Sequence, residues 1–210
     1  MITEKLIAEK LLQVEAVKLS PEKPFTWASG WKSPIYCDNR KVLSHPYFRD
    51  FIKSELCNNV FEKYPDADAI AGVATAGIAW GAMIADQLKL PFIYVRPKPK
   101  EHGMGNQIEG AYEKGQKVVV IEDLVSTGKS SLQVVDVLRE KEMEVMGMIS
   151  IFQYEFQKAI DDFKTAQVEF SSLTNYSALL QLALEKNIIS EDKLPVLNEW
   201  RLSPDSWQGI

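Results

Sequence analysis

Two long apolar runs constrain the fold of this chain more than any other feature. Residues 118–121 are Val-Val-Val-Ile, and the run from Met146 to Phe152 is interrupted only by Gly147 and Ser150. A strand with one face in water alternates apolar and polar residues, whereas a strand covered on both faces does not. The two runs therefore predict central strands of a mainly parallel sheet, with helices on both faces.

Strand and helix patterns alternate along the chain, as parallel crossover units require. Pro46 suits the first turn of a helix, and the segment from Arg96 to Gln116 is unusually long for a connection in a compact domain. Such a loop is usually either a functional lid or disordered. We expect strands at 69–73, 92–95, 117–121, 145–152 and 168–170, and helices at 3–19, 46–60, 78–88, 130–140, 156–165, 176–187 and 190–200.

Composition excludes several classes of protein. A hydrophobic content of 46% in 210 residues is enough for the core of one domain. The net charge of -5 argues against broad binding to nucleic acid or to an anionic membrane. Cys37 and Cys57 lack the spacing of a zinc site, so we expect two reduced thiols. The charged amphipathic N-terminus is not typical of a signal peptide, which predicts a cytoplasmic protein.

The stretch from Ala69 to Ala85 is apolar apart from Thr75 and is nearly long enough to cross a bilayer. It is rich in alanine and glycine, is bounded by Asp68 and Asp86, and has a turn signal in its middle. We therefore expect a buried strand, a tight turn and a helix here, and no membrane contact.

Residues 118–130 carry the strongest chemical signal. The apolar run ends in Glu122 and Asp123, called here the acidic pair, and continues through Ser126-Thr-Gly-Lys-Ser130 into a helix. Backbone N–H groups at a helix N-terminus bind anions, so this turn predicts a phosphate cradle. A nucleotide-binding P-loop fails because its first glycine would fall at Asp123. Two carboxylates instead suit the adjacent hydroxyls of a ribose.

Two further segments follow predicted strands. Thr75-Ala76-Gly77 has small residues that let a ligand approach the backbone closely, although such turns also serve packing. Residues 96–102 concentrate Arg96, Lys98, Lys100 and His102, followed by Gly103 and Gly105. Because the chain is acidic overall, this cluster of cations favours a site that binds phosphate groups over the alternative of a merely solvated surface.

The segment from Phe25 to Tyr36 mixes aromatic and turn residues. It offers a flat apolar surface and backbone hydrogen-bonding groups to a planar base. The alternative is a tryptophan-anchored loop that only packs on the core.

The strand, acidic pair, small-residue turn and helix together resemble the PRPP signature of the type I phosphoribosyltransferases. The glycine-punctuated cationic loop and the Phe25–Tyr36 segment resemble, more specifically, the orotate phosphoribosyltransferases. The resemblance implies one domain over residues 1–210, with a core at about 60–175 and a small hood from about 1–40 and the C-terminal segments. It also implies Mg²⁺ held mainly by PRPP oxygens rather than by a protein site, and a homodimer whose loop reaches into the partner's site.

The same resemblance assigns roles to individual residues. PRPP binding is implied for Arg96, Lys100, His102, Glu122, Asp123, Leu124, Val125, Ser126, Thr127, Gly128, Lys129 and Ser130, pyrophosphate binding for Thr75, Ala76 and Gly77, orotate binding for Ile35, Tyr36 and Ser126, and catalysis for Lys100, His102 and Asp123.

The chain departs from the family pattern at three positions. Ala28 and Ala76 stand where many members have lysine, and Gln153 stands where some have an arginine for the orotate carboxylate. Lys98, Arg40 or a helix N-terminus could take the place of that arginine, and the sequence does not distinguish among them. Two alternatives remain open. One is a phosphoribosyltransferase for a purine or another pyrimidine, and the other is a PRPP-sensing regulator that binds nucleic acid.

Overall fold

The computed structural model describes residues 2–99 and 106–209. Its centre is a six-stranded sheet in the order β10-β9-β8-β5-β6-β7, and every neighbouring pair is parallel except β6 and β7. The strands are β5 (Ala69–Val73), β6 (Phe92–Val95), β7 (Ile108–Glu109), β8 (Lys117–Val125), β9 (Glu144–Gln153) and β10 (Phe170–Asn175). The predicted α/β class with a mainly parallel sheet is confirmed.

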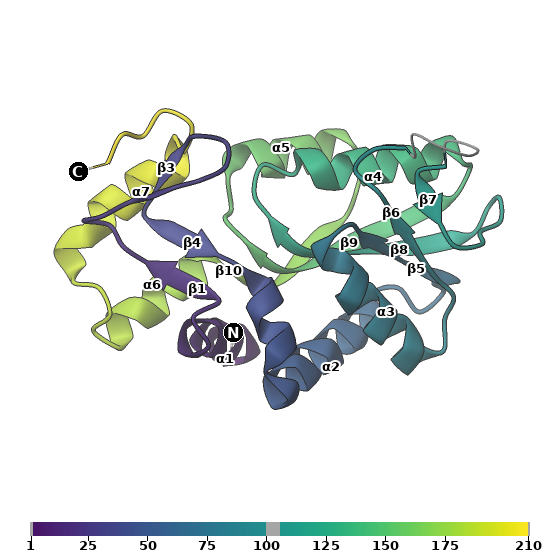
Figure 1. Cartoon of the computed structure of the whole chain (residues 1–210), viewed down its shortest axis with the longest axis horizontal. Coiled ribbons are helices and arrows are strands. Elements are labelled where there is room, and N and C mark those ends of the chain that lie inside the picture. The colour runs from purple at the N-terminus through teal and green to yellow at the C-terminus, as the bar shows by residue number, and fades with distance from the viewer. Residues whose placement is uncertain (1, 100–105, 210) are drawn as a thin grey trace.

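Helices cover both faces of this sheet (Figure 1). One face carries α2 (Pro46–Lys63) and α3 (Ala76–Leu88), and the other carries α4 (Lys129–Glu140) and α5 (Gln157–Thr165). Alternate residues of β8 point to the two sides, so that Val119 and Ile121 join one apolar cluster and Val118 and Val120 join the other. The continuous apolar run is therefore buried from both sides, which is what the sequence predicts.

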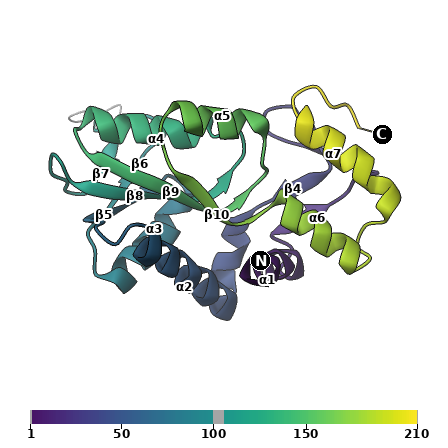
Figure 2. The ribbon, with the colours of Figure 1, turned by 180° about the vertical axis from the view of Figure 1, so that it is seen from behind.

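A smaller layer packs at one end of the sheet and is called the hood here. It combines segments from both ends of the chain, which lie side by side in two opposite views (Figures 1 and 2). Its elements are β1 (Val17–Leu19), β2 (Phe25–Thr26), β3 (Lys32–Ser33), β4 (Ile35–Cys37), α6 (Tyr176–Glu185), the 3-10 helix η2 (Glu191–Lys193) and α7 (Leu194–Leu202). The helix α1 (Ile2–Gln13) lies beside α6 and β10, and the 3-10 helix η1 (Asn39–Ser44) leads into α2.

Tryptophan side chains join the hood to the core. The Trp27 ring contacts Tyr154, Phe156 and Trp200, with ring centroids 5.1, 6.5 and 5.7 Å away. The indole N–H of Trp27 donates to the carbonyl of Ile35 at 3.2 Å, and that of Trp200 donates to the carbonyl of Lys32 at 3.2 Å. The Phe25–Tyr36 segment is thus anchored by tryptophan.

Several predicted boundaries are wrong. The first helix ends at Gln13 rather than Leu19, because Glu15 takes a left-handed conformation (φ 54°) and residues 17–19 then pair with β4. The long connection after β6 returns as β7 along the sheet edge. The strand predicted at 168–170 instead spans Phe170–Asn175. The stretch 69–85 forms β5, a turn and α3 as expected, and no helix among the described residues is long and apolar enough to cross a membrane.

Candidate active site

The carboxyl ends of β5, β6 and β8 lie together at one edge of the sheet. Val73 is opposite Val95 across β5 and β6, and Gly72 is opposite Ile121 across β5 and β8. Three of the four segments predicted to bind ligand follow these strands. Parallel sheets place ligand sites at this edge because the loops that leave adjacent strands converge there.

The acidic pair lies within β8 and not after it, because this strand continues to Val125 along β9. Glu122 is 6% exposed, and its carboxylate accepts hydrogen bonds from the Asp123 backbone N–H at 3.0 Å and the Ser131 hydroxyl at 3.3 Å. Burial and the adjacent Asp123 charge raise the pKa of Glu122 well above its usual value. Glu122 is therefore held more firmly than a solvated ligand carboxylate would be.

Asp123 is the more accessible acid of the pair, with a half-buried side chain. Burial also raises the pKa of its carboxyl, while the positive charge of Arg40 opposes the rise. Arg40 forms an ion pair with Asp38, 2.6 Å from Nε to Oδ1, at the start of η1. The acidic pair thus presents one buried and one half-buried carboxylate, and the cation Arg40 lies nearby.

The turn after β8 has the form of an anion cradle. Ser126 and Thr127 are half-buried, and Gly128 takes a left-handed conformation (φ 79°) as the N-cap of α4. Lys129 and Ser130 are exposed in the first helical turn. Val125 is 1% exposed and its backbone carbonyl accepts from the Tyr154 N–H at 3.2 Å, so it presents almost no surface to a ligand. No side chain in the described part of the chain caps α4, which leaves its first N–H groups for an anion.

The Thr75–Gly77 turn packs directly against the acidic strand. A Cβ built on Gly77 would lie 2.5 Å from the carbonyl oxygen of Ile121, so only glycine allows this approach. The Ala74–Thr75 peptide bond is cis, and Thr75 is exposed. The turn therefore lies directly beside the start of the acidic pair.

Arg96 follows β6 at the same edge. Its guanidinium lies 3.7 Å from the Glu109 carboxylate, and its backbone N–H donates to the carbonyl of Gln107 at 2.9 Å. The Gln107 side chain donates back to the Arg96 carbonyl at 2.8 Å. These contacts close the base of the cationic loop. Lys100 and His102 lie outside the described residues.

A cavity of about 410 Å³ lies between the hood and the end of β8. It brings together residues from separate parts of the chain. Its lining comprises Thr26, Trp27, Ala28, Tyr36, Cys37, Leu124, Ser126 and Tyr154. A mainly apolar, aromatic cavity with a few hydroxyl groups suits a planar heterocycle.

The two predicted base contacts in β4 are placed differently. Tyr36 is 40% exposed and lines the cavity, whereas Ile35 is fully buried in the core. The Ile35 carbonyl is already an acceptor for Trp27 and Ser33. Burial raises the pKa of the Cys37 thiol well above its usual value, so Cys37 lines the cavity as a neutral thiol and not as a nucleophile. Cys37 and Cys57 are both free, as predicted.

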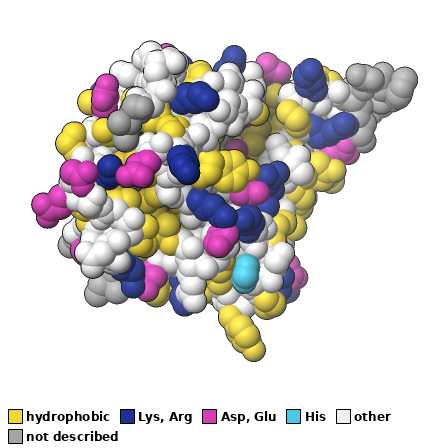
Figure 3. All heavy atoms as spheres, turned by 60° about the vertical axis from the view of Figure 1, so that its left-hand side comes forward, with side chains coloured by type: hydrophobic (Ala, Val, Ile, Leu, Met, Phe, Trp, Pro, Cys, Tyr) yellow, Lys and Arg dark blue, Asp and Glu magenta, His cyan; other side chains and the backbone are white. Residues whose placement is uncertain are grey.

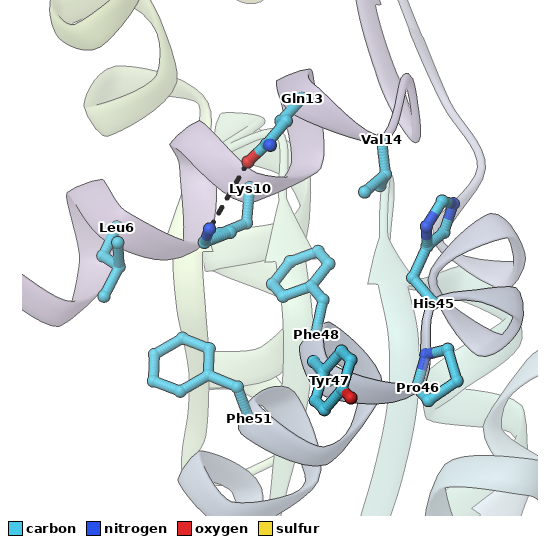
Figure 4. A pocket seen from close by; sticks show the side chains of 9 residues that line it. All are labelled: Leu6, Lys10, Gln13, Val14, His45, Pro46, Tyr47, Phe48 and Phe51. Atoms are coloured by element: carbon cyan, nitrogen blue, oxygen red, sulfur yellow. Dashed lines mark hydrogen bonds between the residues drawn. The ribbon is translucent and has the colours of Figure 1, made fainter.

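Basic side chains gather on the hood side of the molecule although the chain is acidic overall. Figure 3 turns this side forward and shows Lys and Arg side chains near the middle of the face, next to apolar surface. A hollow of about 360 Å³ also lies between α1 and the start of α2, where Phe48, Phe51 and Tyr47 lie under Lys10 and Val14 (Figure 4). None of the predicted site residues that the structure describes lines this hollow.

The sequence does not identify all the residues that build the site. Asn39 is fully buried and donates from its side chain to the Asp123 carbonyl at 2.7 Å. Ser131 supports Glu122, and Tyr154 forms a wall of the base cavity. None of them belongs to a recognisable motif, because each acts through the fold that brings distant segments together.

Comparisons with known proteins agree with this geometry. Residues 52–177 match the phosphoribosyl transferase domain family. The orotate phosphoribosyltransferase of Phocaeicola vulgatus is 55% identical over 206 residues, which cover 98% of this chain and 97% of that protein. The solved orotate phosphoribosyltransferase of Aeropyrum pernix is 28% identical with a TM-score of 0.75, covering 88% of this chain and 99% of that one.

A second solved relative is longer. UMP synthase of Leishmania donovani is 27% identical with a TM-score of 0.78, and the match covers 94% of this chain but only 42% of that one. The Phocaeicola relative, by contrast, is matched over nearly its full length. The chain belongs to the orotate phosphoribosyltransferase family and has the type I phosphoribosyltransferase fold.

Proposed function

We propose that this protein transfers the 5-phosphoribosyl group of PRPP to orotate, giving orotidine 5'-monophosphate and pyrophosphate in pyrimidine synthesis. The observation that carries the proposal is the adjacency of three features at one sheet edge. An acidic pair lies between a helix N-terminus suited to phosphate and a cavity of about 410 Å³ suited to a base. The named function of relatives more than half identical in sequence supports it.

The ribose of PRPP would lie over the acidic pair. The Asp123 carboxylate would accept hydrogen bonds from the ribose hydroxyls, and Glu122 would hold the strand end in shape through Ser131. The 5-phosphate would bind the N–H groups of residues 126–130, and the pyrophosphate would face the Thr75–Gly77 turn. Orotate would then lie in the base cavity, against Tyr36 and Ser126.

Bond exchange occurs at ribose C1. The bond from C1 to the pyrophosphate oxygen breaks as the orotate nitrogen approaches, so positive charge develops on the ribose and negative charge on the leaving group. Arg96, Lys100 and His102 would stabilise the departing charge more strongly than they stabilise bound PRPP, and that difference accelerates the reaction. Closure of the cationic loop would keep water from the ribosyl cation.

The carboxylate and phosphate oxygens expected at this site fit magnesium as a cofactor. Carboxylate and phosphate oxygens are the ligands that Mg²⁺ prefers, and it commonly binds through one or two carboxylates plus substrate oxygens. Asp123, the more accessible carboxylate of the pair, is the protein group best placed to assist PRPP in holding the ion. The ion would supply positive charge to the pyrophosphate.

The family resemblance supports two further parts of the proposal. The cationic loop of one subunit would complete the site of its partner in a homodimer, and the enzyme would act in the cytoplasm. Analytical ultracentrifugation of the purified protein tests the first part, with a monomer at assay concentration as the contrary result.

The decisive experiment follows orotate absorbance after PRPP and Mg²⁺ are added. We expect consumption of orotate in preference to uracil, hypoxanthine or adenine. Asp123→Asn should weaken PRPP binding in calorimetry and leave the fold intact, whereas Asp136→Asn, an exposed change on α4, should behave like the wild type. A protein that binds RNA or DNA in a gel shift but consumes no PRPP would be a regulator instead.

A further inference from the structure

The base cavity does not end at Ser126. A second hollow of about 560 Å³ shares Trp27, Ala28 and Ser126 with it and extends past the phosphate turn. Its remaining lining residues are Ser29, Trp31, Thr127, Lys129, Lys158 and Asp205. The two hollows are adjacent and are together called the recess here, and its outer part carries charged side chains.

Orotate, the base of the proposed reaction, carries a carboxylate that needs a positive partner. Among the described residues that line the base cavity there is no lysine, arginine or histidine. Burial raises the pKa of Tyr154 well above its usual value, so this wall is neutral near pH 7. A buried carboxylate without a cation is costly, so its partner must come from the edge of the recess.

Gln153 is poorly suited to this role although it ends β9 beside Val125. Its side-chain Nε2 donates to the Ser172 hydroxyl at 2.8 Å, so one face of the amide is already engaged. A neutral amide also provides no charge to a carboxylate. The cation must therefore lie elsewhere.

Two lysines line the outer hollow. Lys129 is the first residue of α4 and belongs to the phosphate turn. Lys158 lies in the first turn of helix α5. This helix packs against Gly128 of the phosphate turn. A Cβ built on Gly128 would lie 3.0 Å from Phe163 Cε2 and 3.7 Å from Ala159 Cβ. The α5 N-terminus and its lysine are therefore held beside Ser126, the residue shared by both hollows.

Lys158 is free to change partners. Its Nζ lies 2.8 Å from the Asp162 carboxylate, and its side chain is 65% exposed. An exposed pair of this kind contributes little to stability, so a ligand carboxylate can replace Asp162 at small cost. The flexible stem of lysine lets the ammonium reach along the recess.

We propose that Lys158, on the α5 side of the outer hollow, binds the carboxylate of the pyrimidine substrate and so selects a 6-carboxylated base over a neutral one. The inference rests on the proposed function. It assigns to α5 a specificity role that none of the motifs read from the sequence contains.

Lys158→Gln tests this assignment, with Lys164→Gln as its matched control. Lys164 is an exposed lysine in the last turn of the same helix and does not line the recess. Lys158→Gln should raise the KM for orotate about tenfold, the loss expected for a charged hydrogen bond, while the KM for PRPP stays within about twofold. Lys158→Arg should restore most of the orotate affinity, and Lys164→Gln should match the wild type.

A neutral analogue of orotate tests whether Lys158 recognises the charge of the carboxylate or whether its replacement only alters the shape of the site. The 6-carboxamide analogue of orotate should inhibit wild type and Lys158→Gln with the same inhibition constant. An unchanged KM for orotate in Lys158→Gln, or an equal loss of affinity for orotate and the carboxamide, would overturn the assignment. If the wild type does not consume orotate at all, the proposed function itself fails.

Discussion

The buried side chain of Asn39 donates a hydrogen bond to the backbone carbonyl of Asp123, with 2.7 Å between Nδ2 and O. The two residues are 84 positions apart, and the bond ties the hood side of the chain to the strand that carries the acidic pair. Asn39 also accepts a contact from the Cys37 thiol at 3.4 Å. The position of Asp123 therefore depends on Asn39, a residue that is not itself proposed to contact a substrate.

Asn39→Ala should weaken both the fold and PRPP binding. Removal of the amide leaves the Asp123 carbonyl without its buried donor, which costs about 1–3 kcal/mol of unfolding free energy. Urea denaturation measures that loss, and calorimetry with PRPP measures the change in affinity. Asn59→Ala is the matched control, because its amide donates only to Glu55 within α2 at 3.0 Å. Equal effects of the two substitutions on PRPP affinity would contradict the positioning role.

Glu122→Gln should change how stability depends on pH. Because the folded-state pKa of Glu122 is raised above the ordinary 4.5, the native protein binds more protons than the unfolded chain above that pH. The stability of the ligand-free wild type should therefore decrease as pH rises from about 4.5 towards the raised pKa. Glutamine carries no charge to desolvate and can still bond Ser131, so the variant should be the more stable protein at pH 8.

Urea titrations of both proteins between pH 4 and pH 8 measure this difference. The difference between the two curves isolates Glu122 from the exposed carboxylates, which the proteins share. A wild-type advantage that grows with pH would show that the native state stabilises the ionised form of Glu122.

Much of the fold could be predicted because it depends on local pattern. The apolar run at 118–121 is buried from both sides, and β5 and β6 begin and end where their patterns indicate. The end of β8 could not be predicted, since Glu122 and Asp123 are poor strand formers. They remain in the strand because Glu122 and Leu124 pair with Ser150 and Phe152 of β9, a contact between distant segments.

The residues of the candidate site likewise fall into two groups, those that a sequence motif reveals and those that only tertiary packing brings together. The acidic pair and the phosphate turn are contiguous in sequence, so their chemistry is visible in the motif. The base cavity joins the hood to Leu124 and Tyr154, and the outer hollow adds Lys158 from α5. Side chains gathered by tertiary packing leave no spacing to detect, which is also why the buried position of Ile35 was not anticipated.

Gly77→Ala should disrupt the turn that faces the proposed pyrophosphate. Its new Cβ would meet the backbone carbonyl of Ile121 at 2.5 Å, and backbone cannot move aside as a side chain can. Overpacking of this kind costs about 1–3 kcal/mol. Gly81→Ala in the same helix is the comparison, because its Cβ would meet the Phe92 side chain, which can rotate. Thermal unfolding should show the larger loss for Gly77→Ala, and a larger loss for Gly81→Ala would contradict this account of the turn.

Lys100→Ala should lower kcat by about two orders of magnitude, the usual effect of losing one strong transition-state contact. The reasoning is that pyrophosphate gains charge as the C1–oxygen bond breaks, so a loop cation stabilises the transition state more than bound PRPP. The KM for PRPP should therefore change less than kcat. Lys114→Ala is a suitable control, because Lys114 is an exposed lysine that pairs with Glu142 away from the sheet edge. If Lys100→Ala instead raises KM and leaves kcat unchanged, the loop binds substrate without assisting departure of the leaving group.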